Sequence, residues 1–194
     1  MHIGVLKQTG TERRVAINPD TTKRLTERGH KVTVETGAGA QAGWNDGDFE
    51  GAGALIDTTS AVLGADLLLT VTTLPEQISA TAMLGLLRPF DQPDAMKLLA
   101  GTGTTAFAFE AVPRTTRAQA MDALSSQATV AGYQAVIEAA TLSDRMFPML
   151  TTAAGTLPPA RVLVIGAGVA GLQAIATARR LGGVVSAFDV RAAV

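Results

Sequence analysis

A glycine-rich turn between a strand and a helix constrains the fold of this chain more than any other feature of its sequence. Residues 161–165 read RVLVI, a run of strand length, and residues 172–181 have the composition of a helix. Glycines at the G-x-G-x-x-G positions allow a tight bend, close approach of a pyrophosphate and close packing of helix against strand. We therefore predict a dinucleotide-binding turn, formed by Gly166, Gly168, Val169, Ala170 and Gly171.

An acidic residue follows this turn at the distance that a dinucleotide site requires. A second apolar strand begins at Gly183 and ends at Asp189, eighteen positions after Gly171. A carboxylate there fits the 2′-hydroxyl of the adenosine ribose and repels a 2′-phosphate, which predicts NAD in preference to NADP. Arg191 lies two positions further and weakens that preference, and we count it with the nucleotide-binding residues. The alternative is a purely structural turn, since glycine-rich loops match the motif by chance.

The composition favours an α/β protein and excludes several kinds of site. The 194 residues are 47% hydrophobic but only 4% aromatic, which suits α/β folds better than β-sandwiches. The formal net charge is −1 without a basic block, so we expect no nucleic-acid partner. The lack of cysteine excludes disulfides, thiolate catalysis and zinc–thiolate sites, and we expect no metal.

Nothing in the sequence resembles a membrane span or a targeting segment. No apolar run approaches the length of a transmembrane helix, and the first residues begin a strand, not a signal peptide. The absence of cysteine is compatible with the cytosol. We expect a cytoplasmic chain that reaches a membrane only through its partners.

Strands and short helices alternate through the N-terminal half of the chain. The clearest candidate strands are residues 3–6, 31–36, 66–71, 84–87 and 104–109. This rhythm predicts a mostly parallel sheet that is covered on both faces. The expected fold class is α/β: an N-terminal parallel-sheet domain and a partial Rossmann domain joined by a long helix. We place an N-terminal α/β domain at residues 1–116, a linking helix region at 117–150 and the start of a Rossmann domain at 151–194.

The predicted Rossmann domain is incomplete in this sequence. A doubly wound dinucleotide fold has six strands in the order 3-2-1-4-5-6, and the sequence ends after the second of them. We therefore predict that the strand at residues 162–165 has one edge without a partner from this chain, and such an edge invites oligomerisation. The linking helix is expected over residues 117–140, and residues 151–159 have the composition of a connector.

A polar stripe is predicted along the linking helix. Its members recur every three or four residues and so share one helical face: Gln119, Asp122, Ser125, Ser126 and Thr129. The stripe is either a solvated face or a surface for an amide or sugar hydroxyl, because it carries short hydrogen-bonding groups where a solvated face normally carries Lys and Glu. Arg114, just upstream, could pair with Asp122.

Three blocks of sequence carry a resemblance to a known family. The chain resembles the nucleotide-binding α-subunit of proton-translocating NAD(P) transhydrogenases and, more distantly, alanine dehydrogenase. The blocks are residues 12–19 with 35–39, residues 113–133 and residues 151–191. The resemblance implies a subunit that binds NAD(H) and exchanges hydride directly with NADP(H) on a partner β-subunit, in the Si-specific reaction. The residues that match the family's nicotinamide site are Arg114, Gln119, Asp122 and Ser125.

The same resemblance implies partners and a location. Hydride transfer in the family is coupled to proton movement through a membrane component. We therefore expect a translocase subunit, a homodimer, that lies peripherally at the inner face of the cell membrane. Direct transfer needs no nucleophile and no acid–base residue of the protein, because the nucleotides carry the chemistry.

Departures from the family pattern bear on the choice of activity. Alanine dehydrogenases carry a Lys and a His after the strands that match residues 66–71 and 84–87, and this chain has neither, with Thr70 where the Lys is common. Arg14 is retained, whereas Leu6 and Gln8 replace the usual Pro and Glu. An amino-acid dehydrogenase needs groups that hold the oxo acid and move a proton. An alanine-dehydrogenase-like oxidoreductase is therefore the second choice, and a non-catalytic NAD-binding fragment is the third.

Overall fold

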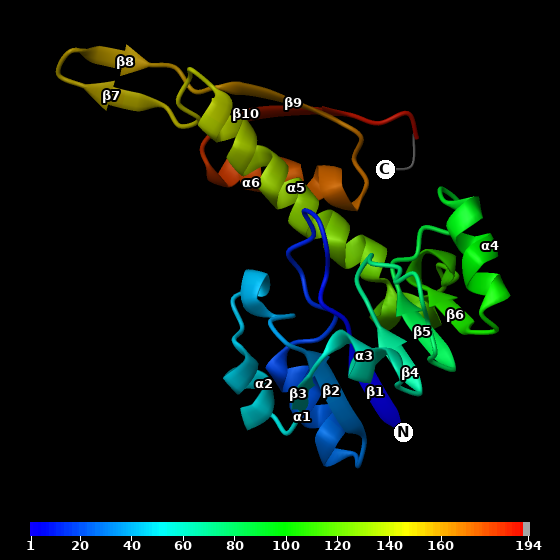
Figure 1. Ribbon diagram of the computed structural model, residues 1–194. Coiled ribbons are helices and arrows are strands. Elements are labelled where there is room, and N and C mark those ends of the chain that lie inside the picture. Colours follow the sequence, from blue (N-terminus) through cyan, green and yellow to red (C-terminus); the bar gives the residue numbers. More distant parts are fainter. Residues whose placement is uncertain (192–194) are drawn as a thin grey trace. The chain divides into compact units, whose positions relative to one another are not determined.

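The computed structural model describes residues 1–191, which divide into two compact units (Figure 1). The boundary between the units falls between Met121 and Asp122. The first unit is built around a large sheet, and the second around two helices and a pair of strands.

The first unit contains a six-stranded sheet in which every neighbouring pair is parallel. The strand order is β3-β2-β1-β4-β5-β6, which is the order of a doubly wound sheet with its switch point between β1 and β4. This confirms the α/β prediction. The strands are β1 (His2–Val5), β2 (Lys31–Glu35), β3 (Leu55–Asp57), β4 (Leu67–Leu69), β5 (Ala82–Gly85) and β6 (Thr105–Ala108).

Both faces of this sheet are buried at its central strands. Successive residues of a strand point to opposite faces, so Leu68 and Leu69 of β4 enter different core clusters. One cluster contains Phe49, which is fully buried. The other contains Met83, which is fully buried as well. Burial on both faces explains why β4 reads as a continuous apolar run and not as an alternating one.

Short helices connect the strands, and their starts follow from capping residues. The side chain of Asn18 accepts a hydrogen bond from the Thr21 amide at 2.8 Å, and Pro19 occupies the first helical position, as the sequence indicated. The elements are α1 (Pro19–Glu27), η1 (Ala40–Ala42), α2 (Asp46–Gly51), α3 (Thr59–Leu63), α4 (Pro93–Gly101), η2 (Phe109–Ala111) and η3 (Thr116–Met121).

The second unit packs two helices against a parallel pair of strands. Its small core is formed by Val136, Phe147, Ala160 and Ala178. Helices α5 and α6 touch at Gly132, where an added Cβ atom would lie 2.1 Å from the Ala170 carbonyl oxygen. Only glycine permits this approach. The elements are α5 (Ala123–Leu142), β7 (Leu150–Thr152), β8 (Gly155–Leu157), β9 (Arg161–Ile165), α6 (Val169–Arg180) and β10 (Val184–Phe188).

Three predicted elements differ from the structure. The helix expected from residue 117 begins at Ala123, because Asp122 is its non-helical N-cap and the preceding residues form the 3-10 helix η3. The strand expected at 84–87 lies at Ala82–Gly85. It ends there because the Glu110 carboxylate accepts the Leu87 and Arg88 amides. The expected connector at 151–159 contains the antiparallel hairpin β7–β8.

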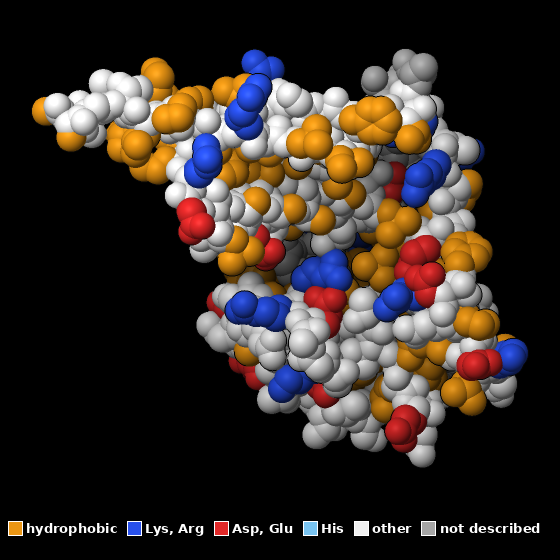
Figure 2. Space-filling view, turned by 90° about the horizontal axis from the view of Figure 1, so that it is seen from above, with side chains coloured by type: hydrophobic (Ala, Val, Ile, Leu, Met, Phe, Trp, Pro, Cys, Tyr) orange, Lys and Arg blue, Asp and Glu red, His pale blue; other side chains and the backbone are white. Residues whose placement is uncertain are grey.

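The outer edge of β9 has no partner among residues 1–191. The parallel partner of β9 is β10, and the two form a two-stranded sheet, so the predicted unpaired edge is confirmed for the described part of the chain. Leu163 and Ile165 are 65% and 79% exposed. Val184 and Phe188 of β10 are exposed as well, so one face of the pair has no packing partner in the described residues. Hydrophobic side chains are also visible on the surface of the protein in Figure 2.

Candidate nucleotide site in the second unit

The turn after β9 has a backbone that requires glycine. Gly166 has φ of 95°, a conformation that other residues rarely adopt. Its amide donates to the Phe188 carbonyl at 2.7 Å, which joins the turn to the end of β10. A Cβ atom at Gly171 would lie 1.8 Å from the Gly166 carbonyl oxygen. Two of the three predicted glycine roles, the tight turn and the close packing of helix on strand, are thus observed directly.

The remaining glycine leaves the start of α6 open. Gly168 is the N-cap of this 12-residue helix and supplies no side-chain cap. A Cβ atom at Gly168 would come within 3.8 Å of the Arg191 guanidinium and of no other group in the described residues. The first turn of a helix has amides without intrahelical partners and carries a partial positive charge. The first turn of α6, with Val169 and Ala170, is therefore suited to a phosphate group.

Asp189 is tied to this turn. Its Oδ2 atom accepts the Ala167 amide at 2.7 Å, so the carboxylate lies at the turn. Arg191 binds the same carboxylate with its backbone amide at 2.8 Å and with two guanidinium nitrogens at 3.0 Å each. The Arg191 hydrogen bond, followed by the Ala167 amide, holds the pKa of Asp189 well below its ordinary value. The carboxylate is therefore charged throughout the neutral and mildly acidic range.

The four hydrogen bonds leave Asp189 little spare capacity. Each carboxylate oxygen accepts two of them, and a carboxylate offers about four acceptor positions in all. The side chain of Arg191 is 59% exposed, whereas that of Asp189 is 9% exposed. A ribose hydroxyl can therefore reach Asp189 only where the guanidinium moves outward, and the exposure of Arg191 permits that movement.

The predicted nicotinamide residues are distributed over both units. Asp122 caps α5: it accepts the Ser125 amide at 2.9 Å and the Ser125 hydroxyl at 2.6 Å. Arg114 and Gln119 belong to the first unit, and both are exposed. Because Gln119 lies in η3, it does not share the α5 face, so the predicted five-residue stripe is wrong at that end. The Ser126 and Thr129 hydroxyls bind carbonyls of their own helix.

Arg14 forms an ion pair within the loop that follows β1. Its guanidinium binds both Glu12 oxygens at 2.8 and 2.6 Å, and its amide donates to the same carboxylate at 3.0 Å. The hydrogen bond from Arg14 lowers the pKa of Glu12 below its ordinary value. The Arg14 guanidinium, which the resemblance to alanine dehydrogenases would assign to an oxo acid, is thus bound by a neighbouring carboxylate.

The structure connects two departures that the sequence showed separately. Gln8 is buried, and its Oε1 atom accepts the Thr72 and Thr73 amides at 2.8 and 3.0 Å. Its Nε2 atom donates to the Leu6 carbonyl and to the Thr70 hydroxyl at 3.1 and 3.2 Å. This uncharged network closes the loops after β1 and β4. Sequence reasoning missed it because Gln8 and Thr70 are 62 positions apart.

A strand, a glycine turn, a helix and a second parallel strand define a Rossmann-type β-α-β unit, and the chain is therefore an α/β protein of the Rossmann-like class. The chain belongs to the alanine dehydrogenase/PNT family. The N-terminal domain of that family matches residues 4–131, and its C-terminal domain matches residues 135–194.

Similar proteins include several transhydrogenase subunits. The chain is 44% identical to NAD(P) transhydrogenase subunit alpha of Cereibacter sphaeroides, over 93% of this chain and 36% of that protein. The solved transhydrogenase of Sinorhizobium meliloti is 46% identical, with a TM-score of 0.95, over 100% of this chain and 60% of that one. The predicted resemblance is confirmed. The chain spans about half the length, or less, of the curated transhydrogenase subunits it matches.

Alanine dehydrogenases are similar to the chain at lower identity. The enzyme of Mycobacterium tuberculosis is 34% identical, over 98% of this chain and 54% of that protein. A solved L-alanine dehydrogenase is 27% identical, with a TM-score of 0.83, over 98% of this chain and 55% of that one. The chain is thus more similar to the transhydrogenases than to the alanine dehydrogenases, as the sequence blocks indicated.

Residues 1–191 lack two other kinds of feature. No helix in this part of the chain combines the length and apolar character that a membrane crossing demands. Within the same residues, no group of three or more His, Cys, Asp or Glu side chains is arranged to hold a metal ion.

Proposed function

We propose that this chain is the NAD(H)-binding part of a proton-translocating NAD(P) transhydrogenase. In this proposal it exchanges hydride directly with NADP(H) on a partner subunit. The observation that carries the proposal is the Ala167–Asp189 hydrogen bond, which places a charged carboxylate beside the glycine turn. Membership of the family and the names of the relatives support the same assignment.

The turn and Asp189 divide the binding of the nucleotide between them. The open first turn of α6 offers backbone amides to the diphosphate, and Gly168 leaves room for it. Asp189 accepts hydroxyls of the adenosine ribose once the Arg191 guanidinium has moved outward. A 2′-phosphate would bring negative charge to a carboxylate that stays ionised. NAD(H) is therefore the expected nucleotide.

The nicotinamide end is assigned to Arg114, Gln119, Asp122 and Ser125. The Asp122–Ser125 hydrogen bonds fix both side chains at the start of α5 and support a positioning role. Bound nicotinamide supplies the hydride chemistry, so the chain itself needs to bind, orient and exclude water. Arg114 and Gln119 are exposed and available for contact with a nucleotide or a partner.

The proposed partners are an NADP(H)-binding β-subunit and a membrane proton-channel component. The chain would thus act in the cytoplasm as a translocase subunit, peripheral at the inner face of the membrane. We also propose a homodimer. The hairpin β7–β8, which projects from its unit in Figure 1, supports this, because all of its residues are exposed and include Leu150 and Leu157.

Titration of the chain with NADH and NADPH, followed by nucleotide fluorescence, tests the site. NADH should bind saturably and more tightly than NADPH. Asp189→Asn should weaken NADH about tenfold or more, because it removes the charge from a charge-assisted acceptor. Asp144→Asn, an exposed acid of the same unit, is the matched control and should change nothing. Equal affinities in the Asp189 variant and the parent would refute the assignment.

A turnover assay separates the alternatives. With the partner subunit added, hydride should pass from NADH to an NADP analogue and not to pyruvate and ammonia. The alanine-dehydrogenase-like alternative is favoured by the similarity to solved L-alanine dehydrogenase and predicts the reverse. The uncharged Gln8–Thr70 network weakens that alternative, since it offers no cation to an oxo acid. NADH binding without either turnover would indicate a non-catalytic fragment.

A further inference from the structure

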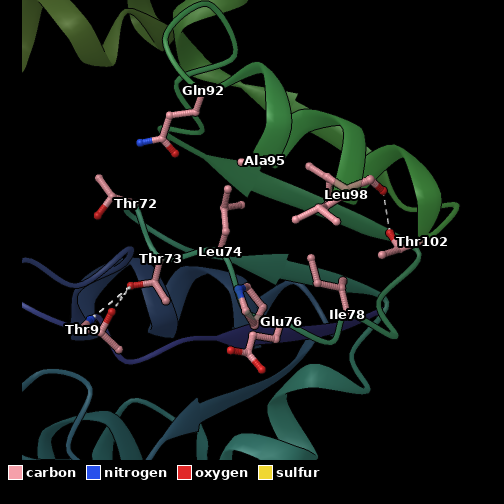
Figure 3. A pocket seen from close by; sticks show the side chains of 12 residues that line it. Thr9, Thr72, Thr73, Leu74, Glu76, Ile78, Gln92, Ala95, Leu98 and Thr102 are labelled. Carbon is pink, nitrogen blue, oxygen red and sulfur yellow. Dashed lines mark hydrogen bonds between the residues drawn. The ribbon is translucent and has the colours of Figure 1, made fainter.

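A pocket of about 560 Å³ lies in the first unit, between the loop after β4 and helix α4 (Figure 3). Thr9 lines it from the loop after β1, and Thr72 and Thr73 line it from the loop after β4. These strands flank the switch point of the sheet. Open α/β sheets bind ligands outside the carboxyl ends of their strands at this place. The volume falls within the usual range for small-molecule sites, about 300–1,000 Å³.

One end of the pocket carries polar groups that the protein itself does not use. Figure 3 places Thr72 and Gln92 at this end, on different elements. Within residues 1–191 the Thr72 hydroxyl and the Gln92 side-chain amide make no hydrogen bond to the protein. The Thr73 hydroxyl, in contrast, is engaged by the amide and hydroxyl of Thr9 at 3.1 and 3.4 Å. Thr72 and Gln92 can therefore donate to and accept from a ligand.

The opposite end of the pocket is largely apolar, and the hydroxyl of Thr102, which also lies there, donates to the Leu99 carbonyl at 2.7 Å. Ile78 and Leu98 lie there in Figure 3, and Leu99 forms part of the buried wall. Leu98 is 77% exposed, although the next residue of α4, Leu99, belongs to the core. An apolar chain or ring bound in the pocket would cover part of that leucine, and burial of apolar surface stabilises a complex.

The charge of the lining selects against anions. Glu76 contributes a carboxylate, and no Lys, Arg or His is among the described residues that line the pocket. A carboxylate or phosphate ligand would therefore meet like charge without a compensating cation. This property distinguishes the pocket from the turn at Gly168, where the first helical turn favours an anion.

We propose that this pocket binds an uncharged amphipathic small molecule. Its hydroxyl or amide groups would be held by Thr72 and Gln92, and its apolar chain or ring would lie against Ile78 and Leu98. The proposal does not depend on the nucleotide site, since every residue that it uses belongs to the first unit.

The test compares two probes that differ only at C6 of the sugar, where a hydroxymethyl group in one is a carboxylate in the other. Hexyl β-D-glucoside is neutral, and hexyl β-D-glucuronide carries a carboxylate on the same frame. We expect the glucoside to bind saturably, with amide chemical-shift changes in the loop after β4 and in α4, and the glucuronide to bind at least about tenfold more weakly. Equal binding of both probes would overturn the proposal. So would shifts confined to the exposed strands β9 and β10, which would indicate adsorption on apolar surface.

Variants assign the contacts. Thr72→Val keeps the shape of the side chain and should weaken the glucoside about tenfold by removing a hydroxyl. Thr141→Val, an exposed threonine on α5, is the matched control. Glu76→Gln should reduce the difference in affinity between the two probes, because it strengthens the binding of the glucuronide alone. An unchanged affinity in Thr72→Val, or an unchanged gap in Glu76→Gln, would contradict the proposal.

Discussion

Two loops in this protein contain the same kind of carboxylate–arginine pair, but only one of the pairs is attached to a glycine turn. In each, a carboxylate accepts the backbone amide and two guanidinium nitrogens of an arginine two positions further along: Glu12 with Arg14, and Asp189 with Arg191. Only the second carboxylate also accepts an amide from a glycine turn, that of Ala167. The comparison teaches that the motif by itself does not make a site. The Asp189–Arg191 pair is a candidate site only because its carboxylate is also hydrogen-bonded to the glycine turn.

The backbone amides beside these two loops are treated differently as well. At the switch point of the first unit, the side chain of Gln8 takes up the amides of Thr72 and Thr73. At the end of β9, the N-cap of α6 is a glycine without a side chain to offer. The two proposed sites thus differ in which backbone amides the chain satisfies itself: those of Thr72 and Thr73 donate to a side chain, whereas the first turn of α6 has no side-chain cap.

The largest expected effect comes from closing the glycine turn. Gly171→Ala would place a Cβ atom 1.8 Å from the Gly166 carbonyl oxygen, so helix and strand must separate. We expect a loss of stability of roughly 3 kcal/mol or more in the second unit, together with loss of NADH binding. Chemical denaturation followed by circular dichroism measures it. Gly51→Ala, which meets nothing within 4 Å, is the control. Comparable stability in both variants would show that the turn tolerates a side chain.

A second substitution places a charge in the uncharged hydrogen-bond network of Gln8 at the switch point. Gln8→Glu would put a buried carboxylate oxygen against the Leu6 carbonyl, which now accepts a hydrogen bond. We expect about 2–4 kcal/mol of destabilisation at neutral pH. Burial raises the pKa of such a glutamate, so the cost should be present above that pKa and should shrink as the pH falls through it. Urea denaturation between pH 7 and pH 4 measures both effects.

The exposed residue Gln77 provides a matched control for this substitution. Gln77→Glu should change stability by no more than about 0.5 kcal/mol, without the same pH dependence. A Gln8→Glu protein as stable as the parent at pH 7 would mean that the switch point accepts charge, and the contrast between the two units would fail.

A smaller effect is expected from the arginine that covers Asp189. Arg191→Leu removes the guanidinium that occupies two acceptor positions of the carboxylate. NADH should then bind severalfold more tightly, because no competing group has to be displaced. Titration by nucleotide fluorescence, with Arg180→Leu on the same unit as control, measures it. Weaker NADH binding in Arg191→Leu would instead make the arginine a contact of the nucleotide.

The smallest effect is expected at the Glu12–Arg14 pair, which is not attached to a glycine turn. Glu12→Gln should lower stability by at most about 0.5 kcal/mol, since exposed ion pairs contribute little. The pKa of Glu12 is lowered in the folded protein, so this contribution is present above the unfolded pKa and is lost as the pH falls through the folded one. Thermal unfolding at pH 7 and pH 3 should show a larger difference between parent and variant at pH 7 than at pH 3. A loss of several kcal/mol would mean that this loop contributes about as much to stability as the glycine turn does.

Local features were predictable from the sequence, and distant pairings were not. The turn at Gly166 and the cap at Asn18 are encoded by adjacent residues, so their signals lie within one short stretch. The start of α5 was misplaced because polar residues at a spacing of three fit a 3-10 helix as well as an α-helix. The Gln8–Thr70 contact joins residues 62 positions apart, and nothing in a single sequence indicates such a pairing.

The glycine at position 132 gives the second unit a mechanical property. Because α5 meets the backbone of α6 at Ala170 without an intervening side chain, the two helices cannot slide past each other on a soft apolar layer. Ala170 lies in the first turn of α6, so a rotation of α5 would move the backbone amides that we propose for the diphosphate. A displacement of Asp122, where α5 starts, would therefore act through the contact at Gly132, in the middle of α5, on the first turn of α6.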